Sequence, residues 1–523
     1  MCPRSSMDRV LVFGTRDQGS IPCGGTSDRI LSMEWVIPQE VRETGKTLIE
    51  AGFSAYLVGG CVRDMLLESP PAGGPKDWDI ATSATPDRIQ ELFPDSVYEN
   101  AFGTVGVKTR SGNSATEVVE VTTFRAEGRY SDHRHPDKVK FAQTIEEDLS
   151  RRDFTINAIA LDMAEKVPKN ITDPFNGQND LKKKLVRAVR NPDQRFQEDA
   201  LRLIKAVRMV SQLDFTLEHE TGEAIVRNAL LLQHIAKERI RDEFEKIIMT
   251  DNAAQGMIFL EKYGLLPYVL LEVVSGIGVD QNHHHIYTVW EHSVRTLDYA
   301  ARKRYSLVVR LAALLHDVGK PATKSGSGEN ATFYSHDAVG SRIARDALGR
   351  LKFSSEIADQ VYHLIRYHMF YYNVGEVTEA GVRRFISRVG AEHLDEFIQL
   401  READRIGSGV PKAQPYRLRH LLFMIDKVRK DPISPKMLAI NGTDIMKVLG
   451  IGPGPRVGWI QKLLLEEVLQ DSRFNTKECL LNRVQELHAR TDDELSTLIG
   501  RAERTRQEFE SVQEEVIKTK HRV

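Results

Sequence analysis

Hydrophobic and polar residues follow two successive patterns along the chain. From residue 34 to about residue 165, short apolar runs of strand length are separated by turns rich in Gly, Pro and Asp. A helix is expected first, from Ile37 to Ala51. Buried strands are then predicted at 56–58, 104–107, 118–124 and 156–161. This part of the pattern predicts a mixed sheet with helices between its strands.

Beyond residue 180 the pattern is helical almost without interruption. A helix is expected to begin near Glu198, and its apolar stripe comprises Leu201, Ile204, Ala206, Val207 and Val210. Similar stripes recur through residues 221–275, and short Pro/Gly breaks separate the helices that follow. The sequence therefore predicts an α/β domain followed by a long all-α region.

Composition supports a multidomain globular protein. The chain has 523 residues, of which 41% are hydrophobic and 28% charged, and a single hydrophobic core rarely grows to that length. The formal net charge is −2, so any surface that binds nucleic acid must be a local basic patch. Residues 182–190, with three lysines and two arginines, are one candidate, but a solvated helix face would look the same.

The cysteines and the apolar runs indicate where the protein works. Four cysteines form no CxxC pair, as expected in a reducing cytoplasm, and no apolar run approaches the length of a membrane span. We therefore expect a cytoplasmic protein without membrane association. Residues 1–32 have mixed charge and no periodicity, and we interpret them as a disordered leader or as an artefact of start-site assignment before Met33.

The densest chemical signal is a pair of carboxylates with a diglycine upstream. Asp77 and Asp79 are separated by one residue, and side chains two apart on a strand share a face. Two ionised carboxylates at such short range repel each other unless a hard cation lies between them. Mg²⁺ fits such a site because it commonly binds one or two carboxylates together with the phosphates of a substrate. Gly59 and Gly60 offer backbone N–H groups and Arg63 a forked cation, both suited to phosphate oxygens. Either motif alone is usually a turn, but together they indicate nucleotidyl transfer.

Further segments occur in an order typical of one family. Residues 117–125 are rich in β-branched side chains, residues 151–160 read Arg-Arg-Asp-Phe-Thr-Ile-Asn-Ala-Ile-Ala, and residues 198–202 read Glu-Asp-Ala-Leu-Arg. With the carboxylate pair, this set resembles the bacterial class II tRNA nucleotidyltransferases, which comprise CCA-adding enzymes and poly(A) polymerases. The resemblance runs from about Val36 to about Glu486. It implies a polymerase-β-like head followed by an all-α neck, body and tail.

The resemblance also implies roles for matching residues. Asp77 and Asp79 would hold Mg²⁺ as catalytic ligands. Glu120 is a candidate third carboxylate, although a charge on a solvated strand face would look the same. The implied nucleotide-binding residues are Gly59, Gly60, Arg63, Arg152, Asp199, Arg202, Lys205 and Arg208.

Asp199 and Arg202 are the pair expected to select the base. At helical spacing i, i+3 they would share one face, where the carboxylate accepts a hydrogen bond and the guanidinium donates several. Cytosine and adenine present an amino donor beside a ring-nitrogen acceptor, whereas uracil and guanine present a carbonyl where the carboxylate needs a donor. An unpaired polar group there costs about 1–3 kcal/mol. An ordinary surface ion pair is the alternative.

Three segments depart from the family or remain ambiguous. Lys205 and Met209 stand where the family commonly has arginine and phenylalanine, so Lys205 keeps the charge but loses the fork. Residues 68–75 form a longer loop, richer in Pro and Gly, than the family has. Residues 128–141 resemble the family's flexible loop, which is thought to help the site change from C to A, but any mobile polar loop would look similar.

A second chemistry begins after residue 290. The ordered series His292, His316, Asp317, His336, His368 and Asp404 resembles the HD-domain phosphohydrolases. Histidine and carboxylate ligands suit a divalent transition metal, or a pair of metals, that activates water for attack on phosphorus. The central His-Asp pair ends an apolar helix predicted at Leu307–Leu315 and is followed by Val-Gly-Lys. The triple histidine at 283–285 is expected on the surface or in a loop.

The C-terminal segments complete the resemblance. Residues 437–449 and 452–469 resemble the body and tail with which the family grips tRNA. Residues 487–523 predict a charged helix that would pack on the body or pair with another chain. Its apolar positions are Leu495, Leu498, Ala502, Phe509, Val512 and Val516.

We therefore expect an enzyme that adds CCA to the 3′ end of tRNA from CTP and ATP, with Mg²⁺ and without a template, and whose HD region hydrolyses a phosphoester. A poly(A) polymerase or an A-only-adding enzyme would share nearly every head motif. From another class, an HD phosphohydrolase whose head only binds RNA is the alternative. The predicted parts are a leader (1–32), head (33–180), neck (181–275), HD domain (280–410), body and tail (411–486) and charged helix (487–523).

Overall fold

The computed structural model describes residues 36–67, 74–98, 103–126, 140–164, 170–281, 286–370 and 372–501. The predicted leader, the triple histidine, most of the loops at 68–75 and 128–141, and the chain beyond residue 501 lie outside these ranges. The chain divides into two compact units. The first comprises residues up to 125 with 141–149 and 159–174, and the second comprises 126–140, 150–158 and 175 onward.

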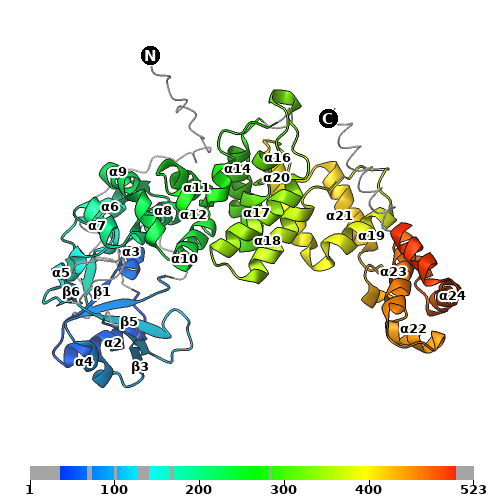
Figure 1. The fold of residues 1–523 in the computed structure, drawn as a ribbon. Coiled ribbons are helices and arrows are strands. Elements are labelled where there is room, and N and C mark those ends of the chain that lie inside the picture. The colour runs from blue at the N-terminus through cyan, green and yellow to red at the C-terminus, as the bar shows by residue number, and fades with distance from the viewer. Residues whose placement is uncertain are drawn as a thin grey trace, which may run out of the picture. The chain divides into compact units, whose positions relative to one another are not determined.

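The first unit is built on a mixed sheet (Figure 1). The strands lie in the order β3-β4-β5-β2-β1-β8-β9, with β2 parallel to β5 and the other neighbours antiparallel. The strands are β1 (Ala55–Val58), β2 (Asp79–Thr82), β3 (Ser96–Tyr98), β4 (Thr104–Lys108), β5 (Val118–Thr123), β8 (Ala160–Asp162) and β9 (Ile171–Thr172). Helices α2 (Gln39–Glu50), α3 (Gly60–Leu66), α4 (Pro86–Leu92) and α5 (Ile145–Ser150) accompany them. The predicted α/β head is confirmed.

One predicted strand is partly wrong. Instead of a strand over 156–161, residues Thr155–Asn157 form a short 3-10 helix, η1, and β8 begins only at Ala160. The Thr155 hydroxyl donates to Asp180 Oδ2 at 2.7 Å, and its backbone N–H donates to the Arg187 carbonyl at 2.9 Å. These contacts turn the backbone away from the ladder. They also explain why residues 150–158 belong to the second unit.

The second unit is almost entirely helical (Figure 1), which confirms the predicted all-α region. Its principal helices are α6 (Gly177–Lys182), α7 (Pro192–Glu198), α8 (Leu201–Leu213), α9 (His219–Asn228), α10 (Lys237–Ile248), α11 (Ala253–Lys262), α14 (Val289–Arg302), α15 (Leu307–Leu315), α17 (His336–Arg350), α18 (Ser355–Tyr367), α19 (Glu379–Val389), α20 (Leu394–Gly407), α21 (Tyr416–Val428), α22 (Gly442–Leu449), α23 (Pro455–Gln470) and α24 (Lys477–His488). No helix in the described ranges has both the length and the apolar character needed to cross a membrane.

The helix predicted to begin near Glu198 is wrong. Helix α7 ends at Glu198 and α8 begins at Leu201. Asp199, between them, is extended with φ −136° and ψ 101°, and its side chain accepts a hydrogen bond from the Leu201 N–H at 3.1 Å. An aspartate that satisfies an N–H group at a helix start favours a new helix there.

The second unit contains two buried apolar regions that matter for function. Helix α15 is buried from Val308 to Leu315 and packs on α14, α18 and α20, so the residues at its end are held by a rigid element. The other region gathers apolar side chains of α22, α23 and α24. Leu495 and Leu498 of the following helical turns pack into it, so of the two alternatives for the C-terminal stripe these positions follow packing on the body.

Candidate functional site

Two carboxylates of the first unit lie on adjacent strands. Asp79, the first residue of β2, lies opposite Glu120 of the parallel strand β5, so their side chains share a face of the sheet. Asp77 precedes β2 and is exposed, while Trp78 between the aspartates is only 3% exposed. The alternation of β2 begins only at Asp79, because Asp77 lies in a bend before the strand. The site therefore offers carboxylate oxygens from two adjoining elements, which is the ligand type that Mg²⁺ prefers.

The diglycine forms the turn between β1 and α3. Gly59 has φ 79° and ψ −136°, a backbone conformation that favours glycine, and α3 begins at the next residue. Arg63 is buried, and its Nε and Nη2 donate to Asp64 Oδ1 at 2.8 and 2.6 Å. Its Nη2 also lies 3.6 Å from where a Cβ on Gly60 would be. The guanidinium is thus held beside the turn, by a carboxylate that the sequence analysis did not single out.

The second unit holds the other predicted nucleotide-binding residues. Arg202 is buried and does not pair with Asp199 through its side chain; it donates to Glu198 Oε2 at 2.8 Å and to the Arg151 carbonyl at 2.9 Å. Asp199 lies 3.4 Å from Arg239 Nη2. The expectation that Asp199 and Arg202 share one helical face is therefore wrong, because a helix break separates them.

The segment containing Arg152 docks against the start of α8. Burial acts to raise the pKa of Asp153, but the positive charges of Lys205 and Arg202 and a hydrogen bond from Asn157 outweigh it and hold the pKa below its ordinary value. Asp153 is therefore ionised and joins this segment to α8. Arg152 and Lys205 are both half-buried in this unit.

The side chain of Arg208, on α8, points toward α10 and not toward Asp199 and Arg202 near the beginning of α8. Its Nε donates to Glu243 Oε2 at 2.6 Å, and Glu243 is buried. The sequence could not predict Glu243 as the partner of Arg208, because no hydrophobic pattern or residue spacing marks this glutamate as buried. This contact joins α8 to α10.

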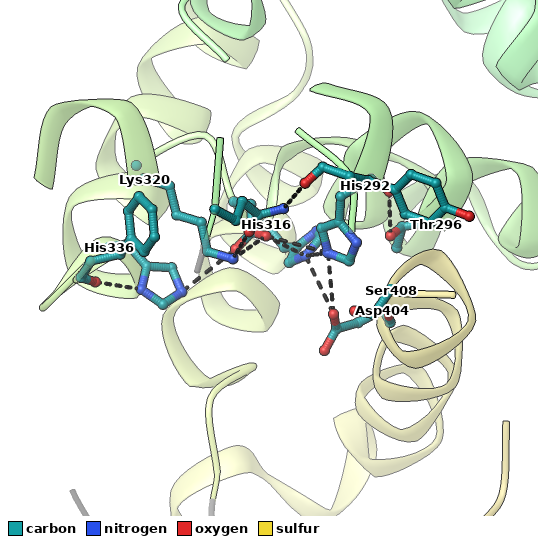
Figure 2. A network of polar contacts seen from close by, with 12 residues as sticks. His292, Thr296, His316, Lys320, His336, Asp404 and Ser408 are labelled. Atoms are coloured by element: carbon teal, nitrogen blue, oxygen red, sulfur yellow. Dashed lines mark hydrogen bonds and ion pairs between the residues drawn. The ribbon is translucent and has the colours of Figure 1, made fainter. Parts of the chain in front are cut away.

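Six predicted ligands of the second unit converge in one buried place (Figure 2). Helices α14 and α20 carry His292 and Asp404, α17 begins at His336, and His316 and His368 stand at the ends of α15 and α18. Two groups form, and within each group the ligand atoms all lie within 4.8 Å of one another. The groups are His292, His316 and Asp404, and Asp317, His336 and His368.

Asp317 stands between the two groups. Its Oδ2 lies 3.3 Å from His292 Nε2 and 3.2 Å from His316 Nε2. Its Oδ1 lies 3.6 Å from His336 Nε2 and 4.0 Å from His368 Nε2. One carboxylate can therefore serve both groups.

Backbone contacts decide which histidine nitrogen faces the site. Nδ1 of His316, His336 and His368 lies 3.0, 2.8 and 2.6 Å from the carbonyl oxygen three residues earlier. A ring N–H at Nδ1 that donates to a carbonyl leaves Nε2 as the lone-pair donor, and such contacts orient metal-bound imidazoles. The residues present therefore fit one or two divalent cations.

Charge also favours cation binding. Burial lowers the pKa of His368 to about 3, so this imidazole is neutral and its lone pair is available. Burial acts to raise the pKa of Asp317, but His316 and Lys320 hold it well below its ordinary range. Asp404 behaves alike, because its contact with His292 and the charge of Arg401 outweigh burial and keep its pKa well below the ordinary value.

Lys320 is a member of this site that the sequence analysis quoted but did not assign. It is 7% exposed, its Nζ forms an ion pair with Asp317 Oδ2 at 2.7 Å, and the same Nζ donates a hydrogen bond to Gln281 Oε1 at 2.6 Å. Gly319 before it has no room for a side chain, because a Cβ would lie 2.3 Å from the His336 carbonyl oxygen. The Val-Gly-Lys run was the available signal; nothing in the sequence pointed to Gln281.

Family models match both regions. The Poly A polymerase head domain matches residues 55–187, the probable RNA and SrmB-binding site of polymerase A matches 214–276, and the HD domain matches 289–407. The fold and the matched domains define a nucleotidyltransferase that also carries an HD domain.

Known proteins narrow this class. The CCA-adding enzyme of Lactobacillus helveticus is 34% identical over 446 residues, which cover 84% of this chain and 95% of that protein. That of Geobacillus thermodenitrificans is 47% identical over 219 residues, 42% of this chain, so that here the chain spans about half (51%) of its relative. The crystal structure of the Bacillus stearothermophilus CCA-adding enzyme in complex with CTP is 28% identical, with a TM-score of 0.64, and covers 86% of this chain and 97% of that chain. The chain belongs to the CCA-adding enzyme family, which confirms the resemblance.

Proposed function

We propose that this protein adds C, C and A to the 3′ end of tRNA from CTP and ATP, without a nucleic-acid template, in the cytoplasm. The observation that carries this proposal is the register that pairs Asp79 of β2 with Glu120 of β5, with Asp77 two positions earlier. Relatives in this family are named for CCA addition, and the relative of known structure binds CTP.

In this proposal the head residues bind the cation and the triphosphate. Asp77 and Asp79, with Glu120 as a third ligand, would hold Mg²⁺ through carboxylate oxygens. The bound cation would neutralise phosphate charge and favour ionisation of the 3′ hydroxyl of the RNA. Arg63, held beside the Gly59 turn by Asp64, would face phosphate oxygens. Positioning and charge neutralisation supply most of the catalysis in such transfers.

The neck residues would choose the base. Asp199 would accept a hydrogen bond from the amino group that cytosine and adenine share. Arg202 would donate to the neighbouring ring nitrogen while Glu198 keeps the guanidinium in place. Lys205, Arg208 and Arg152 would contribute positive charge to nucleotide binding.

Extension of three tRNA transcripts tests the proposal. The transcripts lack CCA, lack only the final A, or are complete, and CTP and ATP are supplied singly and together. We expect CCA on the first, A on the second and arrest on the third. Extension of the second transcript alone would identify an A-adding enzyme, and long A tails would identify a poly(A) polymerase. Failure to extend any transcript would refute nucleotidyl transfer.

We further propose that the HD site hydrolyses a phosphoester at RNA ends, with 2′,3′-cyclic phosphate as the substrate class. The observation in favour is the convergence of two three-ligand groups around Asp317. Bound divalent cations, of a transition metal, would polarise the phosphate and make water nucleophilic at neutral pH. Lys320 would neutralise Asp317 and hold its carboxylate between the groups. Release of a 2′ or 3′ monophosphate by the wild type but not by Asp317→Asn tests this activity; equal turnover would refute it.

A further inference from the structure

Helix α21 exposes aromatic side chains on one side. Tyr416 and Phe423 are 62% and 60% exposed, although large aromatic residues usually lose most of their surface on folding. With His420 they occupy positions i, i+4 and i+7, which lie along one side of a helix. Leu418 and Ile425, on the other side, are buried. These three residues, which we call the aromatic stripe, are therefore not part of the core.

The rings of the aromatic stripe follow one another closely. The ring centroid of His420 lies 5.9 Å from that of Tyr416 and 6.0 Å from that of Phe423. Tyr372, from outside the helix, also contacts His420. The two ring centroids lie 5.9 Å apart, and the Tyr372 hydroxyl lies 2.5 Å from His420 Nδ1. The imidazole is thus fixed between two exposed rings, and the row presents several π faces at short intervals.

Positive charge surrounds the aromatic stripe. Between residues 416 and 430 the exposed cations are Arg417, Arg419, Lys427, Arg429 and Lys430, and the single acid is Asp426. Lys427 pairs with Glu379 at 2.5 Å. For Arg417, Arg419 and Lys430, the described part of the chain shows no ion pair. In a chain with a formal net charge of −2, this is a local basic surface.

Tyr372, whose hydroxyl contacts His420 of the aromatic stripe, lies close to the HD site along the chain. His368, one of the six proposed ligands, precedes Tyr372 by four residues. Four residues span at most about 14 Å. A flexible strand on α21 therefore has only a short path to the proposed ligands.

We propose that α21 binds unpaired RNA, with bases stacked on the aromatic stripe and phosphates on the flanking cations, and that this is the strand whose end the HD site hydrolyses. The second half of the proposal rests on the HD activity proposed above. Bases have apolar π faces and every nucleotide carries a negative charge, which this surface complements. A second copy of the chain would bring the same positive charge to the contact and be repelled.

Binding of a short unstructured oligoadenylate to the full chain, with EDTA present, tests the first half. Tyr416→Ala/Phe423→Ala should raise the Kd about tenfold or more, and Tyr416→Phe/Phe423→Trp should restore it. The control is Phe474→Ala, which removes a 54% exposed aromatic side chain from the 3-10 helix η6 (Ser472–Phe474) and should leave the Kd unchanged. An unchanged Kd in the alanine double variant, or an equal rise in the control, overturns RNA binding by α21.

Salt dependence separates stacking from charge. Arg417→Gln/Arg419→Gln should lower the slope of log Kd against log salt by about 1.4, because each phosphate contact to a single strand contributes about 0.7. The aromatic double variant should keep the wild-type slope. Equal slopes in all variants would contradict the proposed phosphate contacts.

The second half is tested by two substrates of the HD site. The alanine double variant should lower kcat/KM about tenfold for an oligoribonucleotide ending in a 2′,3′-cyclic phosphate. It should leave bis(p-nitrophenyl) phosphate unaffected, because this substrate has no nucleotide strand to reach α21 from the HD site. Equal losses on both substrates overturn the link between α21 and the HD site. If the wild type hydrolyses neither, the HD activity and the second half fail together, whereas the binding experiment decides the first half independently.

Discussion

At the scale of single residues, the two sites hold their carboxylates in opposite surroundings. Asp77 and Glu120 are exposed, whereas Asp317 is 1% exposed and has three histidine Nε2 atoms within 3.6 Å. Ligands that are buried and already oriented lose little freedom when a metal binds, whereas exposed carboxylates must give up water and mobility. We therefore infer that a divalent cation in the HD site would be retained more tightly than one in the head.

The carboxylate face of the head gives the first prediction. Asp79→Asn should lower nucleotide addition about a thousandfold, because metal-assisted charge stabilisation contributes several kcal/mol. Glu120→Gln should lower it as well, if Glu120 is the third ligand that the register indicates. The measurement is single-turnover transfer of CMP from CTP to tRNA lacking CCA, with release of pyrophosphate. Glu117→Gln, an exposed glutamate before β5, is the matched control and should retain activity; a full rate in Asp79→Asn would contradict the metal role.

The proposed metal ligand His368, compared with the control His363, gives the second prediction. His368→Asn should lower the metal that remains bound after gel filtration, because it removes one of six convergent ligands. His363→Asn is the control, since the Nε2 of His363 contacts the Val389 carbonyl at 2.5 Å and belongs to neither ligand group. Elemental analysis of both variants makes the comparison. Equal metal content would contradict the ligand assignment.

The sequence revealed much of these sites because their residues occur in local motifs. The spacing of Asp77 and Asp79 predicts a shared strand face. The position of His316 and Asp317 directly after an apolar helix predicts ligands held by a rigid element. The sequence could not reveal contacts made by unpatterned residues, such as Gln281 with Lys320, since no spacing rule joins residues 39 positions apart.

At the scale of elements, the junction between α7 and α8 shows the limit of periodicity. The apolar stripe of α8 was predicted correctly, but nothing in its period marks the break at Asp199. The break depends on Arg202, which donates to the Arg151 carbonyl 51 residues earlier in the chain. Such long-range contacts help to decide where a helix ends, and local helix propensity cannot predict them.

The junction gives the third prediction. Arg202→Ala should lower the free energy of unfolding by about 2–4 kcal/mol, because it removes the buried guanidinium that donates to Glu198 Oε2 and to two carbonyl groups. Arg302→Ala removes a pair in which the arginine side chain is 60% exposed and should cost less than about 1 kcal/mol. Urea unfolding of both variants decides. Equal small effects would show that Arg202 does not hold the junction.

Asp153 gives the fourth prediction, on pH. Its folded-state pKa is held below the ordinary 3.8, so the charged form stabilises the fold above that pH, and this contribution is lost as pH falls through the depressed folded value. Asp153→Asn should therefore be less stable than the wild type at neutral pH, and the difference should narrow below about pH 4. Unfolding curves across this range test it; a difference independent of pH would contradict the charge interaction with Lys205.

At the scale of the whole molecule, the proposed metal-binding carboxylates of the head and the proposed HD ligands lie in separate compact units. The order of an α/β head and an all-α region was predictable, because strand and helix periodicities differ strongly. The assignment of residues 150–158 to the second unit was not, because it depends on hydrogen bonds such as that from the Val189 N–H to the Asp153 carbonyl.

This separation gives the fifth prediction. Asp79→Asn should lose nucleotide addition but keep phosphoester hydrolysis, and Asp317→Asn should do the reverse. Both activities are measured on each full-length variant, with circular dichroism as the control for folding. Loss of both activities in either folded variant would show that one site depends on the other.

The central claim is that the head builds CCA. The most direct measurement is sequencing of the 3′ ends formed when tRNA lacking CCA is incubated with the protein, CTP, ATP and Mg²⁺. The account predicts ends that finish in CCA and grow no further. Ends that carry only A, or no added nucleotides at all, would contradict it.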